Sequence, residues 1–301
     1  HGVIDGVVPP EALRSVLDRT LAVILDPPGP PPPAPQPAAV ADIPAWDSVL
    51  ASRRPDRPGA EYVLRHGATD PVVLSASGGP ERRDPDTEQD TTSGQTLLAL
   101  ARFGGQPAVV LGQRRLGMLG PEALRAARRG MALAAGLRLP LVSFIDTAGP
   151  ALSADAEQDG LAGEIARCLA ELVTVPVPTV SILLGQGSGG PALAMVPADR
   201  VLAAQHGWLA PLPPEGASAI VFRDTDHAPE LSAAQGIRSA DLLRNGIVDV
   251  IVAEQPDAAD EPKAFTARLS ATIAGELHRL RAMSDIERVG TRLHRYRRIG
   301  L

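Results

Sequence analysis

The chain has 301 residues, and 44% of them are hydrophobic, which is enough for one large packed domain or two smaller ones. Its net charge of -6 and isoelectric point near 5.6 argue against nucleic acid or an anionic membrane as the main partner, because both would require a broad basic face. A single cysteine, Cys168, rules out an internal disulfide. No stretch approaches the roughly 20 apolar residues of a membrane span, and no signal peptide opens the chain, so we expect a cytoplasmic protein.

The beginning of the chain shares a pattern with a later segment. His1-Gly-Val-Ile-Asp-Gly-Val-Val8 matches Asn245-Gly-Ile-Val-Asp-Val-Ile-Val252 in its polar residue, glycine, aliphatic pair, aspartate and final aliphatic pair. In both places the pattern predicts a turn followed by a short strand. We interpret the match as an internal duplication. Residues 1–25 are then expected to be the tail of an earlier, homologous domain, with its last helix over residues 10–25.

Two stretches have a composition that cannot form a core. Residues 26–45 contain nine prolines and predict a semi-rigid polyproline II linker between domains, with a ligand for an SH3-type domain as the alternative. Residues 75–94 are rich in Asp, Glu, Arg, Thr and Gly and lack aliphatic periodicity, so they predict a mobile loop.

From residue 108 onward, predicted strands and helices alternate. Such alternation implies parallel strands joined by right-handed crossovers, so the predicted fold class is α/β. Cys168 lies at helical spacing from Leu161, Ile165 and Leu172, which predicts a small apolar core residue and not a catalytic thiol. The predicted strands cover residues 108–112, 141–145, 179–184, 200–204 and 248–252, and the predicted helices cover residues 121–136, 156–173, a short turn near Ala192 and residues 216–223.

Two of these strands run into glycine turns. Leu141-Val-Ser-Phe-Ile-Asp-Thr-Ala-Gly149 and Val180-Ser-Ile-Leu-Leu-Gly-Gln-Gly-Ser-Gly-Gly190 are each continuously apolar before the turn, as suits strands buried on both faces. Glycines at such turns let a ligand approach the backbone, where exposed amides bind negative oxygen. The second turn formally fits G-x-G-x-x-G, but it follows at least two strands and Asp199 precedes the next one, which disfavours a dinucleotide site.

Common catalytic and metal-binding motifs are absent from the sequence. There is no H-E-x-x-H, C-x-x-C or G-x-S-x-G, and the histidines lack ligand spacing, so no metal is expected in this chain. Chemistry that depends on backbone amides needs none of these, because each preorganised N–H group contributes about 3 kcal/mol to holding an enolate or ureido oxyanion. Five histidines are predicted to be surface or capping residues: His66, His206, His227, His278 and His294.

A series of motifs follows one order along the chain: Trp46-Asp-Ser-Val-Leu-Ala-Ser-Arg-Arg-Pro-Asp-Arg-Pro58, Phe144-Ile-Asp-Thr-Ala-Gly149, Gly185-Gln-Gly-Ser-Gly-Gly-Pro-Ala-Leu-Ala194, Pro213-Pro-Glu-Gly-Ala-Ser-Ala219 and Gly246-Ile-Val-Asp249. This series resembles the carboxyltransferase α half, the α-subunit-like C-terminal half, of acetyl-CoA and other acyl-CoA carboxylases. The resemblance covers about residues 42–256, and residues 1–25 would be the tail of the β half.

The resemblance implies a crotonase-like (ClpP/crotonase) ββα superhelix over residues 46–256, followed by a helical extension over residues 257–301. It implies transfer of a carboxyl group from carboxybiotin to acetyl-CoA or another acyl-CoA, giving malonyl-CoA or a homologue for fatty-acid biosynthesis. The biotin would be attached to a biotin carboxyl carrier protein and not to this chain. The implied partners are that carrier, a biotin carboxylase and a β-type carboxyltransferase half in an oligomeric, ATP-dependent complex, with no nucleic acid and no membrane.

The resemblance also implies site residues. Asp146 is expected to order the glycine turn through an Asx bond, and Glu215 either orients the ureido group or caps the helix that begins near Gly216. By position, the oxyanion amides on the biotin side belong to Gly187, Gly189 and Gly190, the facing loop is shaped by Asp146, Thr147 and Gly149, and the pocket is lined by Pro214, Glu215 and Gly216. These assignments require the main-chain nitrogens near Ser188 to face a cleft.

One position departs from the family pattern, which usually reads Gly-Gly-Ser-Gly-Gly-Ala-Leu-Ala. The ungapped match places Pro191, which has no N–H, on the last glycine. A shift of one residue instead aligns Ser188-Gly189-Gly190 with the family's Ser-Gly-Gly and makes Pro191 the first helical residue. Pro191 and the missing first domain also motivate an alternative function, a catalytically degenerate scaffold or binding subunit.

The C-terminal segment is basic and amphipathic. Residues 276–301 contain seven arginines and three acidic residues, with Leu277, Leu280, Ile286 and Leu293 in helical register. We expect a helix that packs on a neighbouring subunit and exposes its basic face to solvent.

Overall fold

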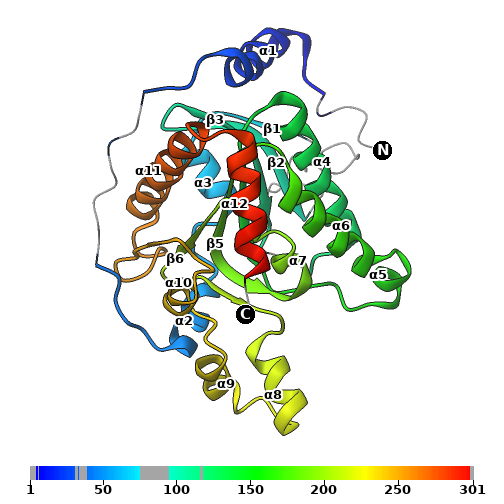
Figure 1. Ribbon diagram of the computed structural model, residues 1–301, viewed down its shortest axis with the longest axis vertical. Coiled ribbons are helices and arrows are strands. Elements are labelled where there is room, and N and C mark those ends of the chain that lie inside the picture. The colour runs from blue at the N-terminus through cyan, green and yellow to red at the C-terminus, as the bar shows by residue number, and fades with distance from the viewer. Residues whose placement is uncertain are drawn as a thin grey trace.

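The computed structural model describes residues 5, 7–30, 33, 39–74, 95–115 and 118–298 (Figure 1). The predicted loop over residues 75–94 lies outside the described residues. So do residues 31, 32 and 34–38 of the predicted linker over residues 26–45 and most of the His1–Val8 pattern.

The described strands form one eight-stranded sheet with the order β1-β2-β3-β4-β5-β6-β8, and β7 pairs with the end of β5. β1, β2 and β3 are antiparallel, whereas β3 to β8 are parallel, which confirms the predicted α/β class and its parallel pairing. The strands span Thr69–Leu74 (β1), Thr96–Phe103 (β2), Gln106–Gln113 (β3), Leu141–Thr147 (β4), Thr179–Ser188 (β5), Arg200–Ala204 (β6), Trp208–Ala210 (β7) and Val250–Val252 (β8).

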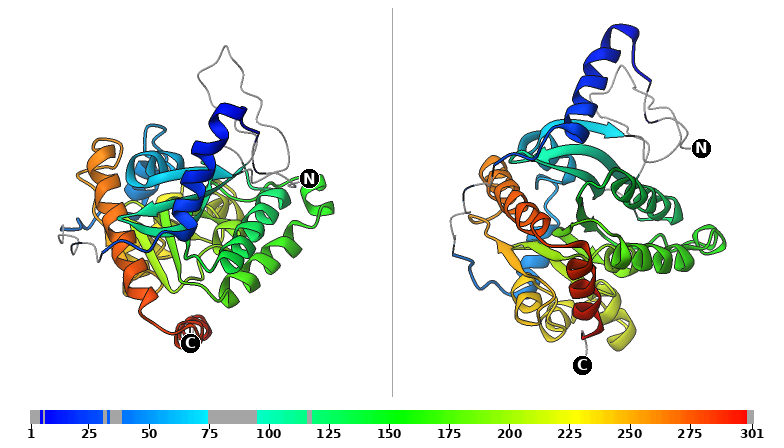
Figure 2. Two further views of the ribbon diagram at one scale, coloured as in Figure 1. Left: turned by 90° about the horizontal axis from the view of Figure 1, so that it is seen from above. Right: turned by 45° about the horizontal axis from the view of Figure 1, so that its top comes forward.

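Helices cover both faces of the sheet. α4 and α6 lie on one face and α3 and α11 on the other, while α1 lies against β1 and β2 (Figures 1 and 2). The helices span Pro10–Leu25 (α1), Ala45–Ser52 (α2), Ala60–Gly67 (α3), Pro121–Leu137 (α4), Ala154–Gln158 (α5), Leu161–Thr174 (α6), Gly189–Leu193 (α7), Pro214–Phe222 (α8), Ala228–Ala234 (α9), Ser239–Arg244 (α10), Pro262–Arg281 (α11) and Asp285–Arg297 (α12).

Each face has its own apolar core. Met131 of α4 and Cys168 of α6 pack on the first face, and Phe265 and Ile273 of α11 pack with Phe144 of β4 on the second. Cys168 is fully buried, and burial raises the pKa of its thiol to about 12, so the prediction of a core residue is confirmed.

Two predicted elements differ from the structure at glycines. The predicted helix over residues 156–173 is two helices, because Gly160 adopts a left-handed conformation (φ +80°) between α5 and α6. The predicted strand over residues 179–184 continues to Ser188, since Gly187 pairs with both Thr147 and Leu209. The second glycine segment is therefore the end of a strand, and the chain turns only at Gly189.

Two arginines of the C-terminal basic helix are not solvated in the way predicted. Arg288 and Arg292 of α12 are 2% and 1% exposed. Arg292 donates to the Asp199 carboxylate (2.7 Å) and to the carbonyls of Leu172 (3.0 Å) and Val175 (2.9 Å) at the end of α6. The predicted basic face is confirmed at Arg279, Arg281, Arg297 and Arg298, which are exposed. It is wrong at Arg288 and Arg292, because a helix C-terminus and a carboxylate of the same chain together attract these two cations.

Candidate active site at the ends of β4 and β5

The two predicted glycine segments lie side by side in the structure. β4 and β5 are parallel neighbours, and Thr147 at the end of β4 pairs with Gly187 near the end of β5. Beyond them, a side chain on Gly149 (φ +136°) would come within 3.5 Å of the Ser188 hydroxyl oxygen. Because parallel strands place their carboxyl ends at one edge, residues far apart in the sequence meet there.

Close packing within the chain explains why several of these positions are glycine. A Cβ atom on Gly185 would lie 2.6 Å from an Asp146 carboxylate oxygen, and one on Gly187 would lie 2.4 Å from the Trp208 carbonyl oxygen. Gly189 has a φ of +74°, and its Cβ would lie 2.7 Å from Pro150 Cδ. The sequence suggested that these positions are glycine because a ligand approaches the backbone. In the structure, close packing against neighbouring parts of the same chain already requires glycine there.

The predicted donor glycines differ in accessibility. Gly187 and Gly189 are buried, as is Ser188, whereas Gly190 is partly exposed. Gly190 lies in the first turn of α7, where an N–H group has no acceptor within the helix. Pro191 is the third residue of α7 and not its first, so it removes one further donor from that turn. Among the predicted donors, Gly190 is the one residue that is partly exposed.

Asp146 and Thr147 order the two segments from within. Asp146 Oδ1 accepts a hydrogen bond from the Gln186 amide (3.0 Å), and Oδ2 pairs with Arg115 Nε (2.8 Å). Burial raises the pKa of Asp146 to about 6, while Arg115 and the Gln186 amide act in the opposite direction. Thr147 Oγ1 accepts from the Gly149 amide (3.1 Å). The local turn bond that was expected of Asp146 is thus made by Thr147, and Asp146 instead joins β4 to β5.

Glu215 pairs with an arginine that sequence reasoning did not single out. Arg53 follows α2 and donates to both carboxylate oxygens of Glu215, with Nη2 3.0 Å from Oε2. Its Nε donates to Gln186 Oε1 (3.2 Å). The hydrogen bond from Arg53 holds the pKa of Glu215 below its usual range. Pro213 precedes α8 and the helix has no side-chain cap, so the capping role considered for Glu215 is not the one that the structure shows.

The other two pocket residues flank Glu215 in the first turn of α8. Pro214 is buried and Gly216 is partly exposed. Arg53 brings this turn close to β5, because one guanidinium contacts Glu215 and Gln186 together. The signal that could have identified Arg53 is the concentration of arginines after Trp46, where Arg53 and Arg57 lie four positions apart.

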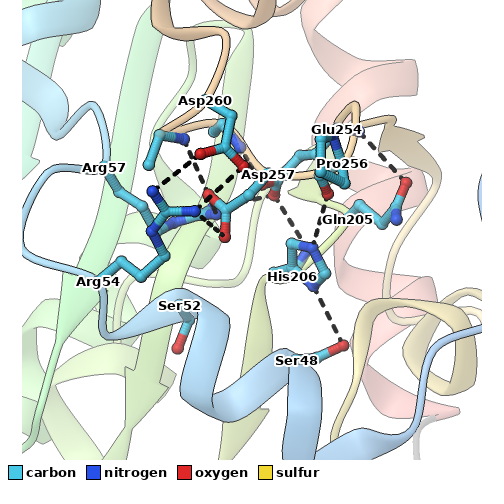
Figure 3. Close-up of polar contacts among 12 residues, drawn as sticks. Ser48, Ser52, Arg54, Arg57, Gln205, His206, Glu254, Pro256, Asp257 and Asp260 are labelled. Carbon is cyan, nitrogen blue, oxygen red and sulfur yellow. Dashed lines mark hydrogen bonds and ion pairs between the residues drawn. The ribbon is translucent and has the colours of Figure 1, made fainter.

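A second polar cluster is formed around Arg57 by residues that follow β6 and β8 (Figure 3). His206, Glu254 and Asp257 are 4%, 4% and 6% exposed, and one potential ligand atom of each lies within 4.8 Å of the others. His206 was predicted to be a surface or capping residue, which is wrong: the loop after β6 carries it inside.

Arg57 already supplies the positive charge of this cluster. Its Nη2 donates to Glu254 Oε1 (2.9 Å) and its Nη1 to Asp257 Oδ1 (2.7 Å). The Glu254 carboxylate also accepts from the amides of His206 (3.0 Å) and Ala258 (2.7 Å). These donors fill the acceptor positions of Glu254, and the positive charge of Arg57 opposes a metal ion in this cluster.

Comparison with known proteins identifies the family. The family described as "Acetyl co-enzyme A carboxylase carboxyltransferase-like" matches residues 36–300. The chain belongs to this carboxyltransferase family. It is 34% identical over 272 residues to the acetyl-coenzyme A carboxylase carboxyl transferase subunit alpha of Heliobacterium modesticaldum, covering 86% of this chain and 78% of that one.

A more similar relative is longer. The probable biotin-dependent acyl-coenzyme A carboxylase beta3 subunit of Mycobacterium bovis is 67% identical over 306 residues, covering all of this chain but 60% of that protein. The chain therefore spans about three-fifths of the length of that carboxyltransferase relative.

Two solved structures share the fold of this chain. Transcarboxylase 12S, solved with methylmalonyl-coenzyme A bound, superposes with a TM-score of 0.64 at 18% identity over 88% of this chain and 50% of that one. A single-chain, multi-domain long-chain acyl-CoA carboxylase gives 0.61 at 20% identity over 90% of this chain and 26% of that one. These likenesses confirm the predicted crotonase-like fold. Within the described part of the chain, no helix has the length and apolar character to cross a bilayer.

Proposed function

We propose that this chain supplies the α-type carboxyltransferase half of a cytoplasmic, biotin-dependent acyl-CoA carboxylase, with acetyl-CoA as the substrate and malonyl-CoA as the product for fatty-acid biosynthesis. The observation that carries the proposal is the meeting of the two glycine segments at the ends of β4 and β5, in a chain that belongs to the carboxyltransferase family. The absence of motifs for a side-chain nucleophile agrees with chemistry that relies on backbone amides.

Carboxybiotin, delivered by a carrier protein, would supply the carboxyl group. In this chain the amide of Gly190 would donate to the ureido oxygen, where negative charge develops, with Gly187 and Gly189 shaping the turn behind it. Asp146 would hold the two segments at their observed spacing through the Gln186 amide, and Thr147 would fix the turn of the first segment through the Gly149 amide. Pro214, Glu215 and Gly216, in the first turn of α8, would line the biotin pocket. Gly149 would shape the facing loop.

The remaining parts of the complex are proposed as partners. Relatives from Parafrankia and Salinispora arenicola are named carboxyl transferase subunits beta/alpha, and this chain covers 54% and 56% of them. We propose that residues 1–25 are the tail of such a β-type half, residues 26–45 a linker, residues 46–256 the α-type domain and residues 257–301 its helical extension. The biotin carrier, a biotin carboxylase and the β-type half would assemble with it as an oligomer.

A matched pair of variants at Gly190 tests the proposed role of its amide. Gly190→Ala and Gly190→Pro both add a Cβ that meets the end of the Ile165 side chain (2.7 Å), but only proline removes the N–H group. In the full-length protein assembled with its carboxylase partners, we expect Gly190→Pro to lower kcat about 100-fold relative to Gly190→Ala. Equal rates for the two folded variants would refute the role of this amide, and a wild-type complex without biotin-dependent carboxyl transfer would refute the function.

A degenerate scaffold is a second candidate function. It is favoured by the burial of Ser188 and Gly189 and by the missing N–H group of Pro191. A scaffold should show no carboxyl transfer in its native assembly, and Pro191→Gly should restore some. An active wild-type assembly that gains nothing from Pro191→Gly rejects it.

A further inference from the structure

Gln186 stands out among the residues of β5. It is the one residue of the ten in this strand that is partly exposed, and it lies between the buried Gly185 and Gly187. Its side-chain oxygen accepts from Arg53 Nε (3.2 Å). A guanidinium can only donate, so this contact fixes the orientation of the amide: Oε1 faces Arg53, and the Nε2 group with its two N–H donors faces away. Among the described residues, nothing accepts from those donors.

Arg53 holds a carboxylate beside this amide. Its Nη2, the nitrogen next to Nε on the same side of the planar group, donates to Glu215 Oε2 (3.0 Å). The side chains of Arg53 and Glu215 are each 31% exposed. A carboxylate has about four lone-pair positions, of which Arg53 occupies two, so Glu215 retains acceptors that solvent or a ligand can reach.

The result is a donor and an acceptor anchored on one rigid group. Trp46 supports that group, with its ring centroid 5.7 Å from the guanidinium carbon of Arg53. The positive charge of Arg53 balances the negative charge of Glu215. The pair therefore does not repel an anionic ligand as a lone carboxylate would. A complementary ligand has a carbonyl oxygen and an N–H group on neighbouring atoms, which is the arrangement in a cyclic urea.

We infer that Gln186 Nε2 donates to the ureido oxygen of biotin and that Glu215 accepts from the ureido N–H, with Arg53 as the positioning residue for both. The inference rests on the proposed function. When one ureido nitrogen carries the carboxyl group, the other retains its N–H, so the same contacts serve both carboxybiotin and biotin. The thioester carbonyl of an acyl-CoA has no adjacent N–H and fits the pair less well.

The test is the exchange Gln186→Glu in the full-length protein assembled with its carboxylase partners. Glutamate keeps the shape of the side chain and the acceptor for Arg53, but it replaces the free NH2 donor with a carboxylate oxygen. We expect KM for the biotin carrier protein to rise at least about tenfold, as for the loss of one hydrogen bond to a ligand, with KM for acetyl-CoA within about twofold of wild type. Gln186→Met, in which the new side chain is uncharged, should likewise raise KM for the biotin carrier protein and leave KM for acetyl-CoA nearly unchanged.

Gln235→Glu is the matched control, because it makes the same exchange at an exposed residue at the end of α9 and should leave both constants unchanged. Unchanged constants in the two Gln186 variants, in an active complex, would overturn the inference and leave the proposed function standing. A rise in KM for acetyl-CoA alone would overturn it too, by assigning the donor to the thioester. A wild-type complex that transfers no carboxyl group from biotin would overturn the proposed function itself.

Discussion

Arg53 and Arg57 are four positions apart in the sequence, and each pairs with a carboxylate from a distant part of the chain, yet their surroundings differ. The Arg57 side chain is 3% exposed and that of Arg53 is 31% exposed. Arg57 donates to two carboxylates and a carbonyl, and main-chain amides complete those carboxylates. Arg53 leaves its partners Gln186 and Glu215 with unused donors and acceptors.

The difference teaches how to separate a structural ion pair from a functional one. A buried charge whose partners are all satisfied cannot be removed without leaving another charge unpaired, and a new ligand finds nothing to bind. A partly exposed pair contributes little to stability but can present oriented groups to a ligand. We therefore assign Arg57 to the stability of the fold and Arg53 to the site, and three predictions test that contrast.

The largest expected effect is on stability at Arg57. Arg57→Met keeps much of the length of the side chain but leaves Glu254 and Asp257 buried without their cation, so the free energy of unfolding should fall by about 3–5 kcal/mol. Equilibrium unfolding in urea measures it. Arg54→Met is the control, because Arg54 pairs with Asp56 and Asp260 at the surface and should change stability far less. Similar values for the two variants would contradict the assignment of Arg57.

An effect of intermediate size is expected from Asp146, which links the two regions through Arg115 and Gln186. Its pKa is about 6 in the folded protein and 3.8 as an ordinary value, so between these pH values the folded state retains a proton that the unfolded state has lost. This group therefore makes stability fall by about 3 kcal/mol as the pH rises from about 4 to 6.

Asp146→Asn should remove that pH dependence while still accepting a hydrogen bond from the Gln186 amide. Urea unfolding at a series of pH values measures the difference from wild type. The exchange Asp155→Asn, at an exposed residue of α5, should leave the wild-type profile in place. An Asp146→Asn profile parallel to wild type would mean that this carboxyl group titrates normally.

The smallest change in stability is expected at Arg53. Arg53→Lys keeps the charge but cannot hold Gln186 and Glu215 together, since a lysine lacks the planar fork. The free energy of unfolding should change by less than about 1 kcal/mol, because the pair is partly exposed. KM for the biotin carrier should nevertheless rise about as much as in Gln186→Glu. A large loss of stability with an unchanged KM would reverse the contrast with Arg57.

The parts of the fold that could be predicted from the sequence are those with strong local patterns. The apolar runs of β4 and β5 and the amphipathic α4 were found near their observed starts. Burial on both faces leaves a continuous apolar run, and burial of one helix face leaves a period of about 3.6 residues. The antiparallel β1–β2 pair was not predicted. β2 is fully buried, but its apolar run comes directly after the long polar stretch over residues 75–94. β7 has three residues, too few for a period to be seen.

The candidate site was predicted in its backbone but not in its side chains. The two glycine segments and the first turn of α8 could be located because glycine and proline restrict the local conformation. The burial of Ser188 and Gly189 against their own chain could not be predicted from the sequence, because it depends on where β7 and Pro150 pack. His206 carries no local sign of its burial, and the loop that holds it gains Glu254 as a partner only through the sheet.

By itself, the sequence determined the order of strands and glycine turns, the family, and a set of arginines after Trp46 with no indication of their partners. The tertiary structure alone decided that Arg53 meets Gln186 and Glu215, which are 133 and 162 positions away, and that Arg57 meets Glu254 at 197 positions. The physical reason is that backbone preferences are set by neighbouring residues, whereas the burial of a charge and the partner that balances it are set by segments that only folding brings together.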